Sequence, residues 1–309
     1  MSTPMITGQF ANSTTSPLAN MTFVSAAIAD IFKKEFTFIA GQRNTDMQIE
    51  KVMAWEGAGS APEKAESANP EERKITESYV DNVVQKTYSL EWPMSIEQQR
   101  FSIKNAQFIK HVSDMRARSI ALSYEYVTAA KYSNGFATDT TGDALYAFSA
   151  AHLWKSDGST FSNLLTTSTF DKTALQDALV QTEQQEMEYD VKANVMPKEL
   201  RYGTDHIMAI KEVLKSIKDP DTANNTYNPV TDWNLKPVLN HYFNSNDWFL
   251  SCAEGSDDEF VKILQSMAPT FYEDKQASGA RNIIMGSMAM FGVGYQHSKA
   301  IKLYGNSGS

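Results

Sequence analysis

The two residues of this sequence best placed to do chemistry together are Ser149 and His152, three positions apart in a loop-rich stretch. Hydrolases use a serine hydroxyl beside an imidazole as nucleophile and general base. Ser149 is not in a Gly-x-Ser-x-Gly elbow, however, and nothing in the sequence selects an acid that would orient His152. We interpret His152 as a hydrogen-bonded loop histidine and expect no enzyme. A hydrolase using Ser149 and His152 stays as an alternative of a different class.

Metal and cofactor chemistry has little support. The histidines lie far apart in the sequence and form neither a His-Glu-x-x-His motif nor a ligand-like pair. They are His111, His152, His206, His241 and His297. The single cysteine, Cys252, excludes a cysteine-based zinc cluster and an intrachain disulfide, and we expect it in the core. Two Gly-x-Gly segments, at 57–59 and 292–294, do not complete a nucleotide-binding motif. We predict no metal, no cofactor and no catalytic residue.

Composition narrows the class of partner. The chain has 309 residues, 42% of them hydrophobic, which allows a substantial core in one or two domains. Its formal net charge of −9 would repel a phosphate backbone, which argues against sequence-specific nucleic-acid binding. No basic segment followed by an apolar run opens the chain, and no apolar run is long enough for a membrane span. We expect a soluble, unsecreted chain with no membrane partner.

A long helix is predicted at residues 95–131. The stretch contains no Gly or Pro, and Ser95 stands three residues before Gln98 in the capping-box pattern. At roughly 1.5 Å per residue the helix would be about 55 Å long, so we interpret it as a spine for the rest of the chain. Its predicted buried face consists of Phe101, Phe108, Met115 and Leu122 at a seven-residue spacing, with Val112 and Tyr126 beside them.

An extended hairpin is predicted before this helix. The segments at 36–55 and 79–92 have β-type composition, with alternation clearest at Tyr88, Leu90 and Trp92. We predict two long antiparallel strands joined by a polar tip at 57–74, in which alanine is the largest apolar side chain. A lone two-stranded ribbon is marginal in water, so a long one needs a surface to lie on. Another copy of the chain would supply that surface.

The remaining segments complete a mixed α and β pattern. Residues 1–20 are polar and uncharged, and residues 21–36 have the spacing of a short amphipathic helix. Helical spacing also predicts packing helices within 170–189, from Phe170 to Met187, and within 204–217. Trp248 and Phe249 predict a buried strand.

A Gly/Asp/Ser/Thr-rich stretch follows the predicted long helix and contains a characteristic series of residues. A second series lies further along the chain. These residues are Gly142, Asp143, Leu145, Phe148, Ser149, His152, Gly158, Ser162 and Asn163, followed by Asn246, Asp247, Trp248, Phe249 and Leu250. The set resembles the major capsid proteins of tailed bacteriophages and is most similar to Mu-like major head subunits. The chain also ends in apolar strand-like segments, as those subunits do. It departs from the family pattern at Ala144, at Leu153 and at 200–205, where Gly, Pro and a more apolar strand are usual.

The resemblance implies an α+β fold, the phage major capsid fold of the Hong Kong ninety-seven type. Carried onto this sequence, it implies five parts in chain order: an N-terminal arm, an extended β-hairpin loop, a peripheral domain with the spine helix, an axial domain, and C-terminal strands that return to the peripheral domain. Their expected boundaries are 1–35, 36–93, 94–170, 171–270 and 271–309.

The implied function is a major capsid protein that self-assembles into the icosahedral shell enclosing the double-stranded DNA of a tailed phage. Its main partner would be itself, as hexamers and pentamers. A separate scaffolding protein, a portal and a decoration or cement protein would be further partners, and packaged DNA would make only weak non-specific contacts. Assembly would take place in the host bacterial cytoplasm and the product would be the virion. An encapsulin-like shell around protein cargo and an adhesion or tail component are the alternatives.

We expect certain residues of the arm, the hairpin and the long helix to contact neighbouring subunits. They are Phe23, Ile31, Trp55, Glu63, Lys64, Glu72, Arg73, Lys74, Trp92 and Arg118. The resemblance also suggests a crosslinking lysine in the loop tip, where Lys64 and Lys74 lie. No partner Asn or acidic catalyst is identified for them, so we expect noncovalent contacts.

Overall fold

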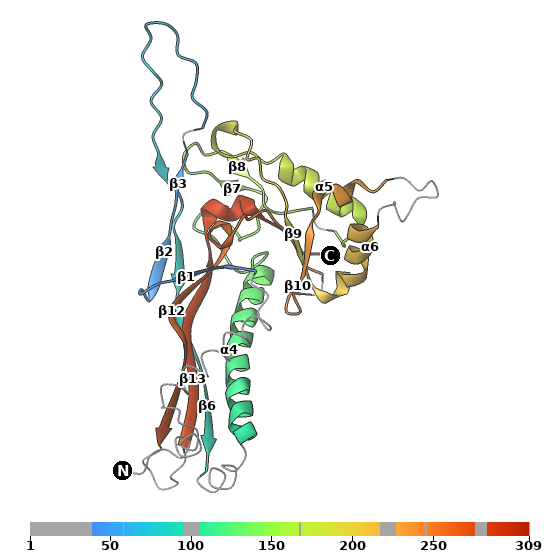
Figure 1. The fold of residues 1–309 in the computed structure, drawn as a ribbon. Helices are drawn as coiled ribbons and strands as arrows, with labels where there is room; N and C mark the ends of the chain where they lie inside the picture. The colour runs from blue at the N-terminus through green and yellow to red at the C-terminus, as the bar shows by residue number, and fades with distance from the viewer. Residues whose placement is uncertain are drawn as a thin grey trace. The chain divides into compact units, whose positions relative to one another are not determined.

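The computed structural model describes residues 39–57, 59–95, 106–166, 168–216, 227–244, 246–275 and 283–308 (Figure 1). The chain separates into two compact units. Unit 1 comprises Met1–Thr37, Gln85–Val127 and Gln265–Gly292, and unit 2 comprises Phe38–Val84, Thr128–Leu264 and Val293–Ser309. The predicted N-terminal arm, with Phe23 and Ile31, lies outside the described residues.

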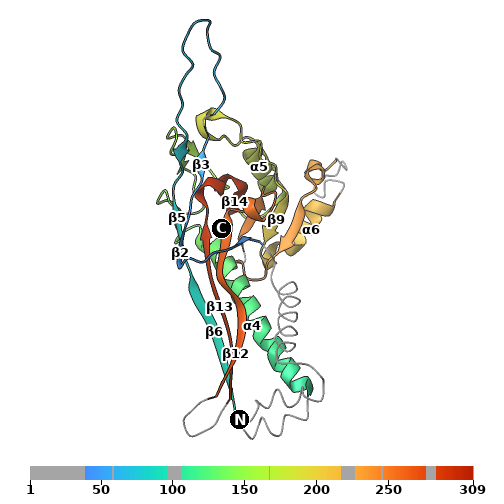
Figure 2. The same ribbon diagram turned by 60° about the vertical axis from the view of Figure 1, so that its left-hand side comes forward.

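Unit 1 packs a helix along three long strands. They are α4 (Ala106–Asn134), whose last turns belong to unit 2, β6 (Lys86–Met94), and the unit 1 portions of β12 (Val261–Lys275) and β13 (Ile283–Tyr295). β13 pairs antiparallel with β6 along nine residues of each strand. Figures 1 and 2 both show α4 running beside these strands. Phe291 of β13 stacks on Tyr88 and on Tyr124 of α4, with ring centroids 4.4 and 3.8 Å away. Aromatic rings therefore fill the space between helix and sheet.

The predicted long helix is confirmed in its described part, and it continues to Asn134, three residues beyond the expected end. The predicted first residue, Ser95, is described and has no helical assignment. Phe101 lies outside the described residues, as do the side chains of Phe108 and Val112. The described part of the helix begins at Ala106. The prediction of one long helix over this region therefore holds from residue 106 onward.

The predicted buried face of this helix is wrong. Met115 is 42% exposed and Tyr126 is 64% exposed, while the buried positions include Ala117, Ala121 and Tyr124. The two alanines lie four residues apart on one face, so they allow the backbone of α4 to come close to the sheet. Tyr124 is the ring that the helix supplies at this contact, and Phe291 and Tyr88 are the rings from the strands. The fit between helix and sheet, and not the spacing of the largest helix residues, thus determines which face is buried.

The hairpin of unit 2 is present, but its strands are short. They are β2 (Ile49–Val52), β3 (Trp55–Glu56), β4 (Thr76–Glu77) and β5 (Asp81–Val84), and β2 pairs antiparallel with β5 and β3 with β4. The prediction of two long strands at 36–55 and 79–92 is therefore wrong. The second stretch divides at Gln85, because β5 stays in the hairpin whereas β6 pairs with β13. The first also divides, since β1 (Gly41–Asn44) is the edge of the sheet β1-β12-β13-β6.

A second four-stranded sheet forms the centre of unit 2. Its strand order is β10-β9-β11-β14, and the elements are β9 (Glu199–Tyr202), β10 (Lys236–Leu239), β11 (Trp248–Ser251) and β14 (Leu303–Asn306). β11 is antiparallel to both neighbours, and β10 runs parallel to β9. Trp248 and Phe249 have no exposed surface, which confirms the predicted buried strand. Rings of Tyr132, Phe136, Phe148 and Phe243 surround Phe249 at centroid distances of 5.0 to 5.7 Å.

Both helices predicted for the later part of the chain are present and shorter than expected. They are α5 (Lys172–Glu183) and α6 (Ile207–Lys215). α5 begins after Asp171, whose carboxylate accepts the backbone N–H of Ala174 at 2.7 Å, and it ends before Met187. Cys252 lies in the core as predicted, and burial raises the pKa of its thiol to about 12. In the described part of the chain, no helix has both the length and the apolar character that a bilayer crossing requires.

Candidate functional site: an exposed hairpin face and a buried Asp-His cluster

The segment between β3 and β4 is a long polar loop that leaves the short strands and returns to them (Figures 1 and 2). Glu63, Lys64, Glu72 and Lys74 are exposed on it, in the positions that a contact with another molecule would use. Arg73 is half-buried. Its guanidinium donates to Glu71 Oε1 at 2.8 Å and to the carbonyl of Ser60 at 3.1 Å, and lies 4.8 Å from the ring centre of Tyr189. Arg73 therefore joins the two sides of the loop to each other.

Two buried carboxylates hold the base of this hairpin to its own unit. Glu56 Oε2 accepts the backbone N–H of Ser156 at 2.6 Å, and Glu188 Oε1 accepts the backbone N–H of Gly57 at 2.5 Å. Hydrogen bonds from backbone N–H groups to carboxylates are charge-assisted and stronger than neutral ones. The hairpin is thus anchored at its base, while its tip is free to reach other molecules.

The outward face of the hairpin carries four exposed apolar side chains, with Lys51 and Asn82 as a polar pair among them. Ile49, Met53, Trp55 and Val84 are 54%, 52%, 69% and 49% exposed, and Ile49 lies directly opposite Val84 in the ladder. We call these four residues the outer row. The alternate residues Glu50, Val52, Glu56 and Val83 point inward and are buried. Of the outer row, sequence reasoning named only Trp55, although the period-two alternation of 49–56 was available as a signal.

The other predicted contact residues lie in unit 1. Trp92 is 41% exposed on β6, opposite Met285, and Arg118 is exposed on α4. The structure thus gathers six of the ten predicted residues on the hairpin and leaves these two on two elements of unit 1. Whether any of them contacts a neighbouring subunit stays a prediction.

A buried cluster of three ionisable side chains lies in unit 2. Asp143 Oδ2 is 2.7 Å from His152 Nδ1 and 3.2 Å from His297 Nε2, and all three side chains are fully buried. We call these residues the Asp-His cluster. Asp143 comes from the loop after α4, His152 from β7 (His152–Leu153), and His297 from the 3-10 turn η5 (His297–Lys302). Spacing in the sequence shows no ligand-like pair among the histidines, but folding brings Asp143 and His297, which are 154 positions apart, into contact.

The surroundings of the Asp-His cluster orient its carboxylate. Asp143 Oδ1 accepts from Thr141 Oγ1 at 2.6 Å and from the N–H of Leu145 at 3.1 Å, which leaves Oδ2 for the two histidines. Although burial by itself would raise the pKa of Asp143, the hydrogen bonds from His152, His297 and Thr141 hold it well below its usual range. The carboxylate is therefore ionised.

Asp81 of β5 joins the hairpin to this cluster. Its Oδ2 accepts the backbone N–H of His297 at 2.6 Å, and its Oδ1 accepts that of Gly142 at 2.7 Å. Burial raises the pKa of Asp81 to about 6, against the effect of these two hydrogen bonds. One carboxylate thus ties the hairpin, the loop after α4 and the C-terminal turn together.

The geometry does not form a serine hydrolase pair. Both ring nitrogens of His152 are engaged, Nδ1 by Asp143 and Nε2 by the carbonyl of Ala147 at 3.2 Å. Ser149 Oγ instead accepts the N–H of Ala151 at 3.3 Å. His152 is therefore a hydrogen-bonded loop histidine, as predicted, and Asp143 is the acid that sequence reasoning did not find.

A second buried charged group surrounds Arg201 of β9. Its guanidinium binds both oxygens of Glu259 at 2.5 and 3.0 Å, Glu199 Oε2 at 2.9 Å, Tyr132 Oη at 2.6 Å and the carbonyl of Ile39 at 2.8 Å. Although burial alone would lower it, these partners raise the pKa of Arg201 above its usual value. Every contact is within the chain, so we assign this group to internal stability.

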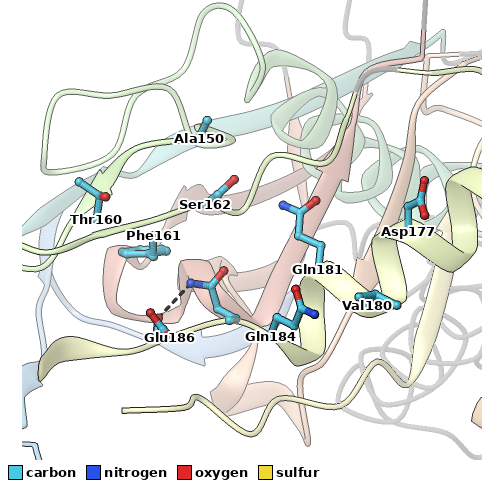
Figure 3. Close-up of a pocket in the computed structure, with 10 residues that line it drawn as sticks. Ala150, Thr160, Phe161, Ser162, Asp177, Val180, Gln181, Gln184 and Glu186 are labelled. Atoms are coloured by element: carbon cyan, nitrogen blue, oxygen red, sulfur yellow. Dashed lines mark hydrogen bonds between the residues drawn. The ribbon is translucent and has the colours of Figure 1, made fainter. Parts of the chain in front are cut away.

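One open pocket of about 480 Å³ lies between α5 and β8 (Thr160–Phe161). Figure 3 shows Gln181, Gln184 and Val180 on the helical side and Thr160, Phe161 and Ser162 on the other. Its lining consists mainly of amide, hydroxyl and apolar groups. Two carboxylates, Asp177 and Glu186, also line it, and none of the charged clusters described above opens into it.

No known protein-family profile matches this chain, and no curated protein sequence does. Solved structures do match. The virus-like particle from Pyrococcus furiosus aligns at a TM-score of 0.55 and 9% identity, over 93% of this chain and 99% of that one. The capsid of the cyanophage P-SCSP1u aligns at 0.55 and 11% identity, over 88% and 86%. The capsid of the native GTA particle aligns at 0.54 and 15% identity, over 88% of each chain. The chain therefore has the α+β capsid fold of the Hong Kong ninety-seven type, as predicted.

Proposed function

We propose that this chain is the major capsid protein of a tailed bacteriophage, of the Mu-like head type, and that many copies assemble into an icosahedral shell around double-stranded DNA. The observation that carries the proposal is the fold, which extends over almost the whole chain and over almost the whole of a subunit from a virus-like particle. The Mu-like assignment has its support in the ordered residues from Gly142 to Asn163 and in the Trp248-Phe249-Leu250 strand.

The outer row supports assembly through contacts between copies. Fully burying a large apolar side chain stabilises by about 1.5–3 kcal/mol. The four side chains of the outer row are only half-buried, so contact with a neighbouring subunit can bury their remaining surface and stabilise the assembly. Trp55 has the largest exposed fraction of the four, 69%, and tryptophan is over-represented among residues that dominate interfaces. A contact between the outer row of one copy and a different surface of the next is heterologous, and such contacts generate rings when the rotation closes.

The charge of the chain fits the proposed contents. A subunit with a net charge of −9 can enclose packed DNA without binding it tightly, because phosphate and subunit repel each other except at local basic patches. We propose that a separate scaffolding protein and a portal act during assembly in the host bacterial cytoplasm, and that a decoration or cement protein is an optional partner. The assembled subunit is then a component of the virion and performs no enzymatic step.

The proposal is tested by the size and contents of the assembled protein. Expressed alone or with the scaffolding protein encoded beside it, the chain is expected to form hollow shells of tens of nanometres in sedimentation and negative-stain electron microscopy. A chain that stays monomeric or dimeric under both conditions contradicts the proposal. Particles purified from infected cells are expected to hold double-stranded DNA that resists nuclease, whereas a protein cargo would point to a nanocompartment instead.

A further inference from the structure

We propose that Asp143, His152 and His297 bind one divalent ion of the zinc class, which fastens three distant segments of unit 2 to one another. Two imidazole nitrogens and one carboxylate oxygen are a donor set typical of zinc. The donor atoms of the three side chains lie within 4.8 Å of one another. This inference does not depend on the proposed function, because the site lies wholly within a single chain.

The distances require only a small adjustment for an ion. Zinc binds nitrogen and oxygen at about 2.0–2.1 Å, so two ligands of a tetrahedral ion lie about 3.4 Å apart. Asp143 Oδ2 and His297 Nε2 are already 3.2 Å apart, and Asp143 Oδ2 and His152 Nδ1 are 2.7 Å apart. The second pair must therefore separate by about 0.7 Å. The donor atoms of His152 and His297, which lie within 4.8 Å of each other, must approach by up to about 1.4 Å, and side-chain rotations can supply both changes.

The outer contacts of the donors are those that metal sites use. Metal-binding histidines usually donate their second N–H to a carbonyl or carboxylate, and ligating carboxylates are themselves hydrogen-bonded. His152 Nε2 faces the carbonyl of Ala147 at 3.2 Å. Asp143 Oδ1 is occupied by Thr141 and Leu145, which aims Oδ2 inward. His297 Nδ1 is buried and has no hydrogen-bond partner among the described residues, so this nitrogen is available to a water molecule.

The charges around the site are compatible with a divalent ion. The ion, the Asp143 carboxylate and two neutral imidazole ligands together carry one net positive charge. The nearby carboxylate of Asp81, which accepts the N–H of His297, is placed to balance it.

The three ligands leave one coordination position for water, and the site is closed to solvent. A structural role follows from where the ligands come from. The loop after α4, β7 and η5 all contribute a donor, and Asp81 extends the connection to the hairpin strand β5. Binding at this point is expected to stabilise the folded unit and the base of the hairpin together.

The test uses the full chain, treated with a chelator and then titrated with Zn²⁺. Calorimetry is expected to give one ion per chain, and the melting temperature is expected to rise by several degrees at saturation. Co²⁺ in place of Zn²⁺ is expected to give the intense visible absorption of a tetrahedral site. His297→Asn is expected to remove the absorption and the rise in melting temperature, while His241→Asn, which changes an exposed histidine, keeps both.

Either of two results would overturn the proposal. One is a folded, chelator-treated wild-type chain that binds no stoichiometric Zn²⁺, which would make the cluster a proton-bridged network only. The other is His297→Asn that binds as the wild type does. Because His297→Asn could fail to fold, circular dichroism is recorded first, and the wild-type titration decides the matter without any variant.

Discussion

Two ladders of unit 2 are built from strands of four residues, yet they treat apolar side chains in opposite ways. β11 lies between β9 and β14, and all four of its residues are buried. β2 pairs only with β5, and the apolar residues Ile49 and Val84 face outward from that pair. The central sheet is therefore completed within the chain, whereas the hairpin has an apolar face that the described chain does not cover. The first region should govern the stability of the subunit, and the second its association.

The strongest test of this comparison is a cavity in the central sheet. Phe249→Ala is expected to reduce the free energy of unfolding by about 3–5 kcal/mol, because the removed ring has aromatic neighbours on several sides. Urea unfolding of the unassembled subunit measures it. Ile49→Ala, in the outer row, serves as the matched control and is expected to change stability by less than about 0.5 kcal/mol. Equal losses at both positions would contradict the distinction between the two ladders.

The next largest effect is expected from removal of the polar loop. Replacing residues 57–75 by a two-residue Asn-Gly turn joins Glu56 to Thr76, which already face each other across the β3–β4 pair. The subunit should keep its circular dichroism spectrum and a cooperative melting transition. The yield of shells, measured by sedimentation, should fall sharply, because we propose that the loop and its charged tip act between copies. Normal shells with unchanged heat resistance would show that the loop has no part in assembly.

A single substitution in the outer row should weaken assembly without unfolding the subunit. Trp55→Gln is expected to raise the critical concentration for assembly about tenfold or more, because the lost burial costs about 1.5–3 kcal/mol per contact. Trp55→Phe retains an apolar ring and should assemble nearly normally. Met196→Gln, which changes another exposed apolar residue, is the control for a general loss of surface hydrophobicity. Identical behaviour of the two glutamine variants would argue against a specific outer row.

A smaller, pH-dependent effect is expected next to β11. Burial raises the pKa of Asp247 from 3.8 to about 6, so the folded state holds a proton that the unfolded chain has released. The carboxyl group therefore lowers stability progressively as pH rises from about 4 to about 6. Asp247→Asn should be more stable than the wild type by about 1–2 kcal/mol at pH 7.5, allowing for partial solvent screening, and equal to it at pH 4.

Thermal melting at both pH values measures this difference. The exposed residue Asp205 provides the control, since Asp205→Asn should give the same small change at either pH. A stabilisation by Asp247→Asn that did not depend on pH would show that titration of the carboxyl group is not its cause.

The smallest effect is expected at the loop lysines. Replacing Lys64 and Lys74 together by arginine should leave assembled particles unchanged, because both residues are exposed and arginine keeps their charge. Denaturing gels of wild-type and variant particles should show a single subunit band. A ladder of subunit multiples in the wild type that disappeared in the variant would show that the hairpin contact is covalent.

Sequence reasoning worked best where one local pattern determined the result. The absence of Gly and Pro over 95–131 and the run of apolar residues at 248–250 predicted a helix and a buried strand, and α4 and β11 are present there among the described residues. It failed where two segments compete for one partner. β6 continues the hairpin strand β5 in sequence but pairs with β13 in a nine-residue ladder, while the segment before β2 contains β1, which pairs with β12.

The candidate site shows the same division. The exposed loop residues were recognisable because a charged tip without apolar side chains belongs at a surface. The Asp-His cluster was not recognisable, because Asp143 and His297 are 154 positions apart and no local motif joins them. Asp143 and His152 were both among the residues that carried the resemblance. Only the folded structure shows that their side chains contact each other.

The amino-acid sequence by itself determined the long helix, the two later helices and the buried strand, because backbone preference and apolar periodicity act over a few neighbouring residues. The α+β class was predicted from the resemblance to a known family. The tertiary structure alone decided that α4 buries Ala117 and Ala121 and not Met115, that β6 leaves the hairpin, and that Asp143 meets both histidines. Each of these outcomes depends on which distant segments come together. Burial and hydrogen bonding are shared between such segments, so neither segment specifies them alone.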